Sequence, residues 1–172
     1  MREAGWGRFV LGLLRDWGLA LGFAIVAWAV WMRFFVGGPL TEGPAPVFTL
    51  PNPAGGSAIA LDALGDGPII LNFWFTSCGP CRAEIPELAR FHAENPDVPL
   101  IGVSIDEMAP SRLAQVSKRL GVTWPVAHDL DNTVSNAYGV TMYPTTIVVR
   151  GGQIEDVHLG GIDAAGLDRL VR

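Results

Sequence analysis

Two cysteines three positions apart are the residues of this sequence with the clearest capacity for chemistry. Cys78 and Cys81 lie in the stretch FWFTSCGPCRAEIP, from Phe73 to Pro86, and they are the only cysteines in the 172 residues. A pair at this spacing can be a redox couple, half of a metal site or a short structural disulfide. The elements around the pair and the side chains that could assist it favour one of the three.

A metal site and a structural disulfide both fit the pair poorly. Zinc takes four ligands, and the two cysteines supply two. The three histidines, His92, His128 and His158, show no pairing at ligand spacing. Cu(I) needs few ligands and stays open as an alternative. A disulfide enclosing only Gly79 and Pro80 closes a very short loop, which in the chain-entropy model contributes little to stability.

The position of the pair favours the redox interpretation. Cys78 follows the apolar run PIILNFWF, which predicts a strand buried on both faces, and it opens a predicted helix. Its sulfur should therefore lie near the unpaired N–H groups and the positive end of that helix, which favours the thiolate. Cys81, one turn later, is placed to resolve a mixed disulfide. Pro80 removes an N–H in the first turn, where its loss costs little.

Strands and helices alternate along the rest of the chain. We expect a last helix that is capped by Asp163 and runs to Arg172. Strands that alternate with helices and end in a hairpin predict an α/β sandwich with a mixed sheet. The expected elements are strands over 68–75, 98–105 and 124–127, helices over 79–95, 111–121 and 132–138, and a hairpin over 145–159 that turns at Gly151 and Gly152.

The N-terminal region predicts a membrane anchor. Residues 17–36 carry a single charge, Arg33, and twenty helical residues rise about 30 Å, enough to cross a hydrocarbon core. Basic residues precede this segment, and the next one after Arg33 is Arg82, so the positive-inside rule puts the N-terminus in the cytoplasm. We expect a cytoplasmic segment over 1–16, a transmembrane signal anchor over 17–36, a Gly/Pro-rich linker over 37–46 and an extracytoplasmic domain over 47–172.

A cleaved signal peptide is the alternative to this anchor. Its apolar core would be shorter, about 7–15 residues, and a small-residue cleavage site would follow it. The one match, AWA at 27–29, lies inside the apolar run.

Composition excludes nucleic-acid binding as a class of function. The net charge is −5 and no block of Lys and Arg recurs, so we expect no nucleic acid among the partners.

Four segments resemble a known family. NFWFTSCGPCRAEIP is similar to the active-site stretch of membrane-anchored, thioredoxin-like disulfide reductases of the TlpA/ResA/DsbE type. APVFTLPNPAGG resembles the opening hairpin of that family, IGVSID its second core strand and YGVTMYPTTIVV the segment with its cis-proline. The resemblance implies a thioredoxin fold, in which helices flank a central mixed sheet. It also implies a thiol–disulfide oxidoreductase that uses no cofactor or metal beyond its own redox-active disulfide.

The family pattern assigns roles to matching residues. Cys78 would be the nucleophile, Cys81 the resolving thiol and Pro144 the cis-proline, whose backbone with Tyr143 would dock an extended substrate segment. The chain departs from the pattern at Ser77, where a Trp commonly stands, and at Phe75, where a small residue is usual. By the resemblance, the substrate-binding residues would be Trp74, Gly79, Pro80, Tyr143 and Pro144.

Glu84 has two interpretations. In similar proteins an acid at this position manages the proton of the buried cysteine, and a partly buried carboxylate can do so because burial raises its pKa. The alternative is a solvated glutamate favoured by the positive end of the helix. Ordinary thioredoxins have a buried acid at the strand position that is Asn72 here. Asn72 cannot titrate, which shifts any proton role to Glu84.

The resemblance also implies partners and a location. The clients would be disulfide-bearing proteins such as apocytochrome c or copper-centre apoproteins, and a membrane electron donor of the CcdA/DsbD type would re-reduce the pair. The protein would be a single-pass protein of the bacterial inner membrane, with its C-terminal domain in the periplasm or cell exterior. A net disulfide oxidase or isomerase, or a Cu(I)-binding delivery module for respiratory oxidase assembly, are the alternatives.

Overall fold

The computed structural model of the chain describes residues 17–30 and 40–172. Its contacts divide the chain into two units, Met1–Gly37 and Gly38–Arg172. In the first unit residues 17–30 are helical. Within the described ranges, no helix has both the length and the apolar character needed to span a membrane. The predicted anchor runs on to residue 36, and its last six residues, like the predicted cytoplasmic segment, lie outside the described ranges.

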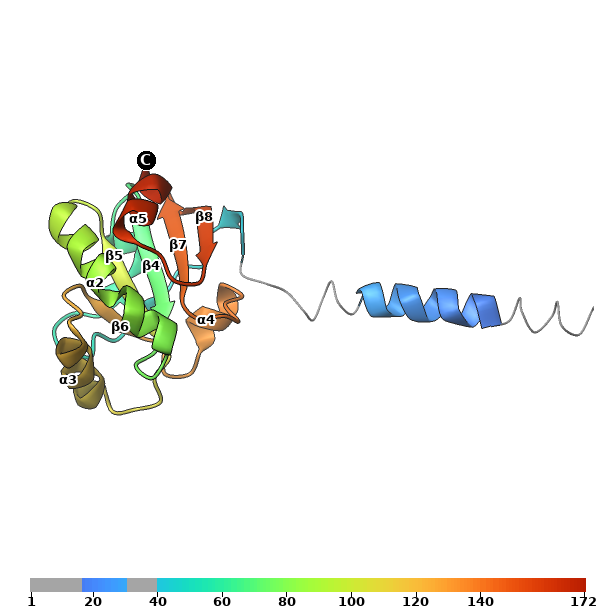
Figure 1. Cartoon of the computed structure of the whole chain (residues 1–172), viewed down its shortest axis with the longest axis horizontal. Coiled ribbons are helices and arrows are strands. Elements are labelled where there is room, and N and C mark those ends of the chain that lie inside the picture. Colours follow the sequence, from blue (N-terminus) through green and yellow to red (C-terminus); the bar gives the residue numbers. More distant parts are fainter. Residues whose placement is uncertain (1–16, 31–39) are drawn as a thin grey trace, which may run out of the picture. The chain divides into compact units, whose positions relative to one another are not determined.

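The second unit is organised around a six-stranded mixed sheet with the order β1-β8-β7-β4-β5-β6 (Figure 1). Strands β4, β5 and β6 are parallel, whereas β7 is antiparallel to β4 and β8 is antiparallel to β7. A separate pair, β2 and β3, forms the opening hairpin. The strands are β1 (Gly43–Pro44), β2 (Thr49–Leu50), β3 (Ile59–Ala60), β4 (Ile69–Trp74), β5 (Leu100–Ser104), β6 (Val126–His128), β7 (Thr145–Arg150) and β8 (Gln153–Leu159).

Helices cover both faces of this sheet (Figure 1). Alternate side chains of a strand point to opposite faces, and β4 divides its residues in this way. Ile69, Leu71 and Phe73 join a core that includes residues of α4 and of the opening hairpin, whereas Ile70 and Trp74 join a core with α2, α3 and α5. The helices are α2 (Gly79–Glu94), α3 (Pro110–Leu120), α4 (Thr133–Ala137) and α5 (Ala164–Val171), and a short 3-10 helix spans Leu61–Ala63.

The fold confirms the predicted mixed sheet between helices. Each strand and helix expected after residue 67 is present, and its ends differ from the expected ones by at most two residues. The final helix is capped as predicted, because Asp163 Oδ1 accepts a hydrogen bond of 2.7 Å from Gly166 N. The turn of the hairpin lies at Gly151 and Gly152, both with positive φ.

The predicted linker over 37–46 is wrong at its C-terminal end. Gly43 and Pro44 form β1 and pair with β8, and Ala45 is buried and donates a hydrogen bond of 2.9 Å to Gly152 O. Glycine and proline indicated a tether. Proline is nevertheless compatible with an edge strand, where a missing N–H breaks no ladder, and β1 is an edge of this sheet.

We predict that Gly102→Ala destabilises the domain. A Cβ at Gly102 in β5 would lie 2.9 Å from Trp74 Nε1 and 3.0 Å from Trp124 Nε1, and both indoles are buried. Overpacking of a core typically costs about 1–3 kcal/mol of unfolding free energy. Denaturant unfolding of the full-length protein measures this loss. Gly67→Ala is the matched control, because a Cβ there meets nothing within 4 Å; equal stability of the two variants would contradict the packing argument.

Candidate active site

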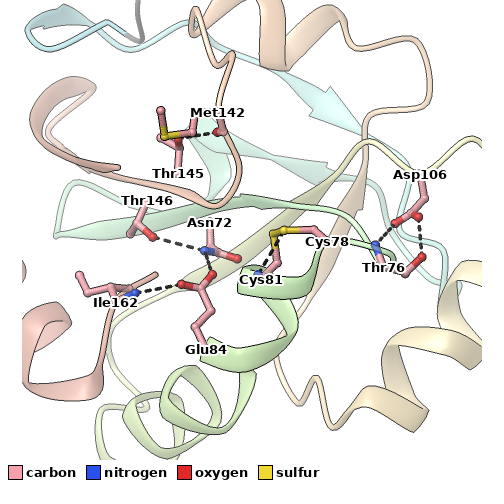
Figure 2. Close-up of a disulfide and its surroundings, with 10 residues drawn as sticks. All are labelled: Asn72, Thr76, Cys78, Cys81, Glu84, Asp106, Met142, Thr145, Thr146 and Ile162. Atoms are coloured by element: carbon pink, nitrogen blue, oxygen red, sulfur yellow. Dashed lines mark hydrogen bonds between the residues drawn. A yellow bond between two sulfur atoms is a disulfide. The ribbon is translucent and has the colours of Figure 1, made fainter. Parts of the chain in front are cut away.

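The cysteine pair lies where β4 passes into α2. Cys78 is the N-cap of α2, and its sulfur accepts a hydrogen bond of 3.1 Å from Cys81 N. The two cysteines form a disulfide (Figure 2). Cys78 is 5% exposed and Cys81 1% exposed. The structure therefore confirms that the sulfur of Cys78 lies at the N–H groups of the first turn, and it leaves Cys78 as the more accessible of the two.

The cis-proline loop lies beside the cysteine loop. The Tyr143–Pro144 peptide bond is cis, as the resemblance implied. The ring of Tyr143 packs edge-on against Phe75, with 5.5 Å between ring centroids, and Tyr143 packs on the same core cluster as the two cysteines. Phe75, in place of a small residue, thus provides a contact between the two loops. Thr145 Oγ1 donates a hydrogen bond of 2.8 Å to Met142 O within the cis-proline loop (Figure 2).

The predicted substrate-binding residues differ in their exposure. Gly79 and Pro80 are exposed, Tyr143 is half-buried, and Pro144 is buried. Trp74 is 2% exposed and faces Gly102 inside the sheet. Trp74 therefore lies in the core of this structure, and its contact with a substrate stays a prediction. The side chain alternates to the face covered by α2 and α3, so Trp74 supports the cysteine loop from the core.

Glu84 lies in the core and not in solvent. Its side chain is 4% exposed, which excludes the interpretation as a solvated first-turn glutamate. Oε1 accepts a hydrogen bond of 2.9 Å from Asn72 Nδ2, and Oε2 accepts one of 3.0 Å from Ile162 N (Figure 2). Asn72 Nδ2 also donates to Thr146 Oγ1 over 3.3 Å. The carboxylate thus joins α2 to β4 and to the segment before α5, and Asn72 extends the network to β7.

Burial raises the pKa of Glu84, whereas the hydrogen bonds from Asn72 and Ile162 and the charge of His158 oppose the rise without cancelling it. Glu84 follows Cys81 by three residues, so both lie on the same face of α2. A carboxyl group that holds its proton above the usual range can exchange one with a neighbouring thiol. This arrangement makes Glu84 a candidate proton carrier on the buried side of the pair.

Asp106 is a site residue that the sequence did not reveal. It lies two residues after Ser104, the end of β5, and is 7% exposed. Its carboxylate accepts hydrogen bonds from Thr76 N at 2.9 Å and Thr76 Oγ1 at 2.6 Å (Figure 2). It also accepts one from Ser104 Oγ at 2.8 Å. Thr76 stands two residues before Cys78, so Asp106 holds the loop that carries the nucleophile. The sequence did contain an indication of this contact. Asp106 ends the motif IGVSID, and the carboxyl ends of adjacent parallel strands, here β4 and β5, meet at one edge of a sheet.

A second buried aspartate holds the start of α4, which precedes the cis-proline loop. Asp129 is fully buried and accepts hydrogen bonds from Val134 N at 3.1 Å and from Ser135 N and Oγ, each at 2.7 Å. It therefore anchors the start of α4, just ahead of the cis-proline loop. Burial raises the pKa of Tyr143 against a hydrogen bond with Ser135, and the charge of Asp129 adds to the rise.

Possible metal ligands among the described residues do not gather into one cluster. No group of three or more His, Cys, Asp or Glu among residues 17–30 and 40–172 is arranged to hold a metal ion. His128, the buried histidine, has its Nε2 2.8 Å from Asp106 O, and the half-buried His158 has its Nε2 3.2 Å from Gly161 O. Both histidines face backbone carbonyls, and the sulfurs of the pair are bonded to each other.

We predict that Glu84→Gln removes a pH dependence of stability. Because the folded-state pKa of Glu84 lies above its ordinary value of 4.5, the folded protein binds more protons than the unfolded chain once the pH passes that value. The free energy of unfolding then falls until the pH exceeds the raised pKa. Gln lacks this fall and, with one acceptor oxygen, loses one hydrogen bond, about 1 kcal/mol at every pH.

Urea unfolding over a pH series, followed by tryptophan fluorescence, measures both slopes. Glu107→Gln is the control, since Glu107 is exposed in the loop after β5, and it should keep the wild-type fall. An identical pH profile for Glu84→Gln and the wild type would show that Glu84 does not titrate in this window.

We predict that Asp106→Asn slows the chemistry of Cys78 as well as lowering stability. Asn has one acceptor oxygen for three donors, so a buried donor loses its partner and unfolding becomes easier by about 1–3 kcal/mol. A displaced Thr76 shifts the N-cap, and small misplacements of a reacting group carry large rate costs, here about tenfold. Alkylation of the reduced protein over a pH series reads the position of Cys78 directly. Asp97→Asn, an exposed change of equal charge, should leave alkylation unaltered, and a purely structural Asp106 would lower stability alone.

Comparison with known proteins agrees with this site. The model of the AhpC/TSA family matches residues 41–157. The thiol-disulfide oxidoreductase ResA of Bacillus subtilis is 36% identical over 64% of this chain and 62% of its own length. ResA of Oceanobacillus iheyensis is 34% identical over 66% of this chain and 59% of its own. The thioredoxin-like protein YneN of Bacillus subtilis is 31% identical over 67% of this chain and 69% of its own length. The chain thus spans about three fifths of the two ResA proteins it matches.

Solved structures show the same fold. StoA from Bacillus subtilis superposes with a TM-score of 0.65 at 24% identity, over 74% of this chain and 98% of StoA. The thioredoxin domain of a thiol-disulfide oxidoreductase from Bacteroides vulgatus superposes with a TM-score of 0.67 at 24% identity, over 77% of this chain and 99% of that domain. With its cysteine pair at the start of a helix and a cis-proline loop beside it, the chain belongs to the AhpC/TSA family and is a thioredoxin-like protein of the TlpA/ResA/DsbE type.

Proposed function

We propose that this protein is a thiol–disulfide oxidoreductase that reduces disulfides of extracytoplasmic client proteins. The observation that carries the proposal is the N-cap cysteine of α2, the more exposed of the pair. It is bonded to a second cysteine one turn inside the helix and is flanked by the cis-proline loop. The relatives named thiol-disulfide oxidoreductase support the same reaction class.

The reaction moves two electrons in two exchange steps. In the reduced protein the Cys78 thiolate attacks one sulfur of the client disulfide, a bond forms between Cys78 and the client, and the other client sulfur leaves as a thiolate that takes up a proton. The Cys81 thiolate then attacks the sulfur of Cys78. The Cys78–Cys81 disulfide forms, the mixed disulfide breaks and the second client thiol is released. The client disulfide is reduced and the protein's dithiol is oxidised.

Glu84 serves the second step. Cys81 is 1% exposed, so water has little access to remove its proton before it attacks. Glu84 lies one turn further along the same face of α2, in a site that raises its pKa. Its carboxylate takes the proton of Cys81 as the thiolate forms, and it returns a proton when the pair is reduced again. Asn72 and Ile162 hold the carboxylate in place for both transfers.

The direction of the reaction depends on a supply of electrons. An oxidising compartment would keep the pair oxidised, so a membrane electron donor of the CcdA/DsbD type has to re-reduce it. The Cys-Gly-Pro-Cys sequence, shared with reducing thioredoxins, favours reduction of clients. Apocytochrome c and copper-centre apoproteins are the client classes consistent with the family. A net oxidase or isomerase is the competing function of the same site.

The location belongs to the same proposal. Residues 17–36 contain one charged residue, Arg33, and basic residues precede them, which supports an uncleaved anchor in the bacterial inner membrane with the domain in the periplasm or cell exterior. Alkaline extraction strips peripheral proteins from membranes. Full-length protein retained in the extracted membranes is the expected result, and release into the supernatant would contradict the anchor.

The redox potential of the Cys78–Cys81 pair tests the direction. We expect a value near that of thioredoxin, about −270 mV, when the full-length protein is equilibrated in glutathione or dithiothreitol buffers. A value near that of strongly oxidising periplasmic proteins, about −120 mV, would favour the oxidase instead. Cys81→Ser should accumulate a mixed disulfide with a client and Cys78→Ser should not, because only Cys78 makes the first attack.

A further inference from the structure

A hollow with two arginines lies next to the nucleophile. Its volume is about 560 Å³, and it lies between the first turn of α2 and the end of α3, which cover the same face of the sheet (Figure 1). We call it the arginine hollow and define it by its lining residues, Gly79, Arg82, Ala83, Arg119 and Leu120. Gly79 stands between the two cysteines, so a segment whose disulfide reaches Cys78 passes over the edge of this hollow.

The position of Arg82 is unfavourable for the helix itself. Its N–H makes the first hydrogen bond of α2, to Cys78 O at 3.1 Å, so the side chain stands in the first turn. The N-terminus of a helix carries partial positive charge and favours anions there. The first turn of α2 nevertheless has no acidic residue. A cation at this point gains nothing from the helix dipole or from a neighbouring acid in the first turn, which favours a role outside the helix.

Both guanidinium groups are free to bind a partner. Arg82 and Arg119 are exposed, and neither forms an ion pair or a hydrogen bond through its side chain with any residue that the structure describes. No acidic residue lines the hollow. By contrast, Arg90, Arg150 and Arg172 are each paired with a carboxylate. In a chain with a net charge of −5, the surface next to Cys78 is therefore locally positive.

We propose that the arginine hollow binds an acidic segment of the client protein, adjacent to the client disulfide that Cys78 attacks. The inference rests on the proposed reductase function and names the chemistry by which that site selects its client. Arginine binds carboxylates with two parallel hydrogen bonds, and Gly79 has no side chain to keep the client backbone away from the rim. Opposite charge also speeds the encounter of the two proteins at low ionic strength.

Three model peptides test this selection with the reduced full-length protein in a neutral detergent. Each has one cysteine in a mixed disulfide with 2-thiopyridine, and the flanking residues are aspartate, serine or lysine. The measured quantity is the ratio of the rate constants for the acidic and the basic peptide. We expect a ratio of about ten or more at low salt and a fall when salt is added. R82E combined with R119E should invert the ratio, and R82Q with R119Q should bring it close to one.

Arg169→Glu is the matched control. Arg169 is exposed on α5, forms no ion pair with any described residue, and lies outside the hollow, so its reversal should leave the ratio unchanged. An unchanged ratio in R82E with R119E would overturn the proposal. Equal changes in all three rates, together with a shifted redox potential, would overturn it too, because the arginines would then act on the thiol.

The same measurement separates this inference from the function on which it rests. Reduction of all three peptides at equal rates by the wild type would leave the reductase standing and reject the acidic segment. Reduction of none of them would reject both.

Discussion

The site depends on one junction, where a strand buried on both faces ends and a helix begins with a cysteine as its cap. β4 ends at Trp74 and α2 begins at Gly79. The sheet, and the core that β4 shares with α2, α3 and α5, hold both elements in place. Because the cap must offer an acceptor to the first turn, the sulfur of Cys78 takes that place and points to N–H groups that favour its ionised form. The chemistry of the pair thus follows from the ordinary requirement to terminate a helix.

The junction is held by buried carboxylates. Glu84 ties α2 to β4 and to the segment before α5, Asp106 ties the cysteine loop to the end of β5, and Asp129 anchors α4 next to the cis-proline loop. A buried carboxylate without partners is very costly, so each of these groups restricts the geometry around it strongly. The hydrogen bonds to these three carboxylates therefore hold the backbone around the disulfide in a defined position.

Glu84 differs from the two aspartates in what its environment permits. Asp106 and Asp129 each accept three hydrogen bonds from hydroxyl and backbone donors, whereas Glu84 accepts one from an amide side chain and one from the backbone. Fewer donors compensate less of the burial, and the pKa of Glu84 is raised. Glu84, which accepts the fewest hydrogen bonds, is thus the carboxylate to which the proposed proton transfer is assigned, whereas Asp106 and Asp129 hold the loops around the pair.

The sequence by itself determined the order of elements, the redox pair and the cap at Asp163, because these depend on local patterns: apolar periodicity, turn residues and two cysteines at fixed spacing. It also identified Glu84, since a helical spacing of three places it on the face of Cys81. It did not decide whether Glu84 is buried. Only the tertiary structure decided the burial of Glu84. It also decided three further features: the core position of Trp74, the pairing of Gly43 and Pro44 with the sheet, and the hydrogen bonds from Thr76 to Asp106. Each depends on contacts between residues far apart in the chain, and local pattern does not specify which distant element covers a given face.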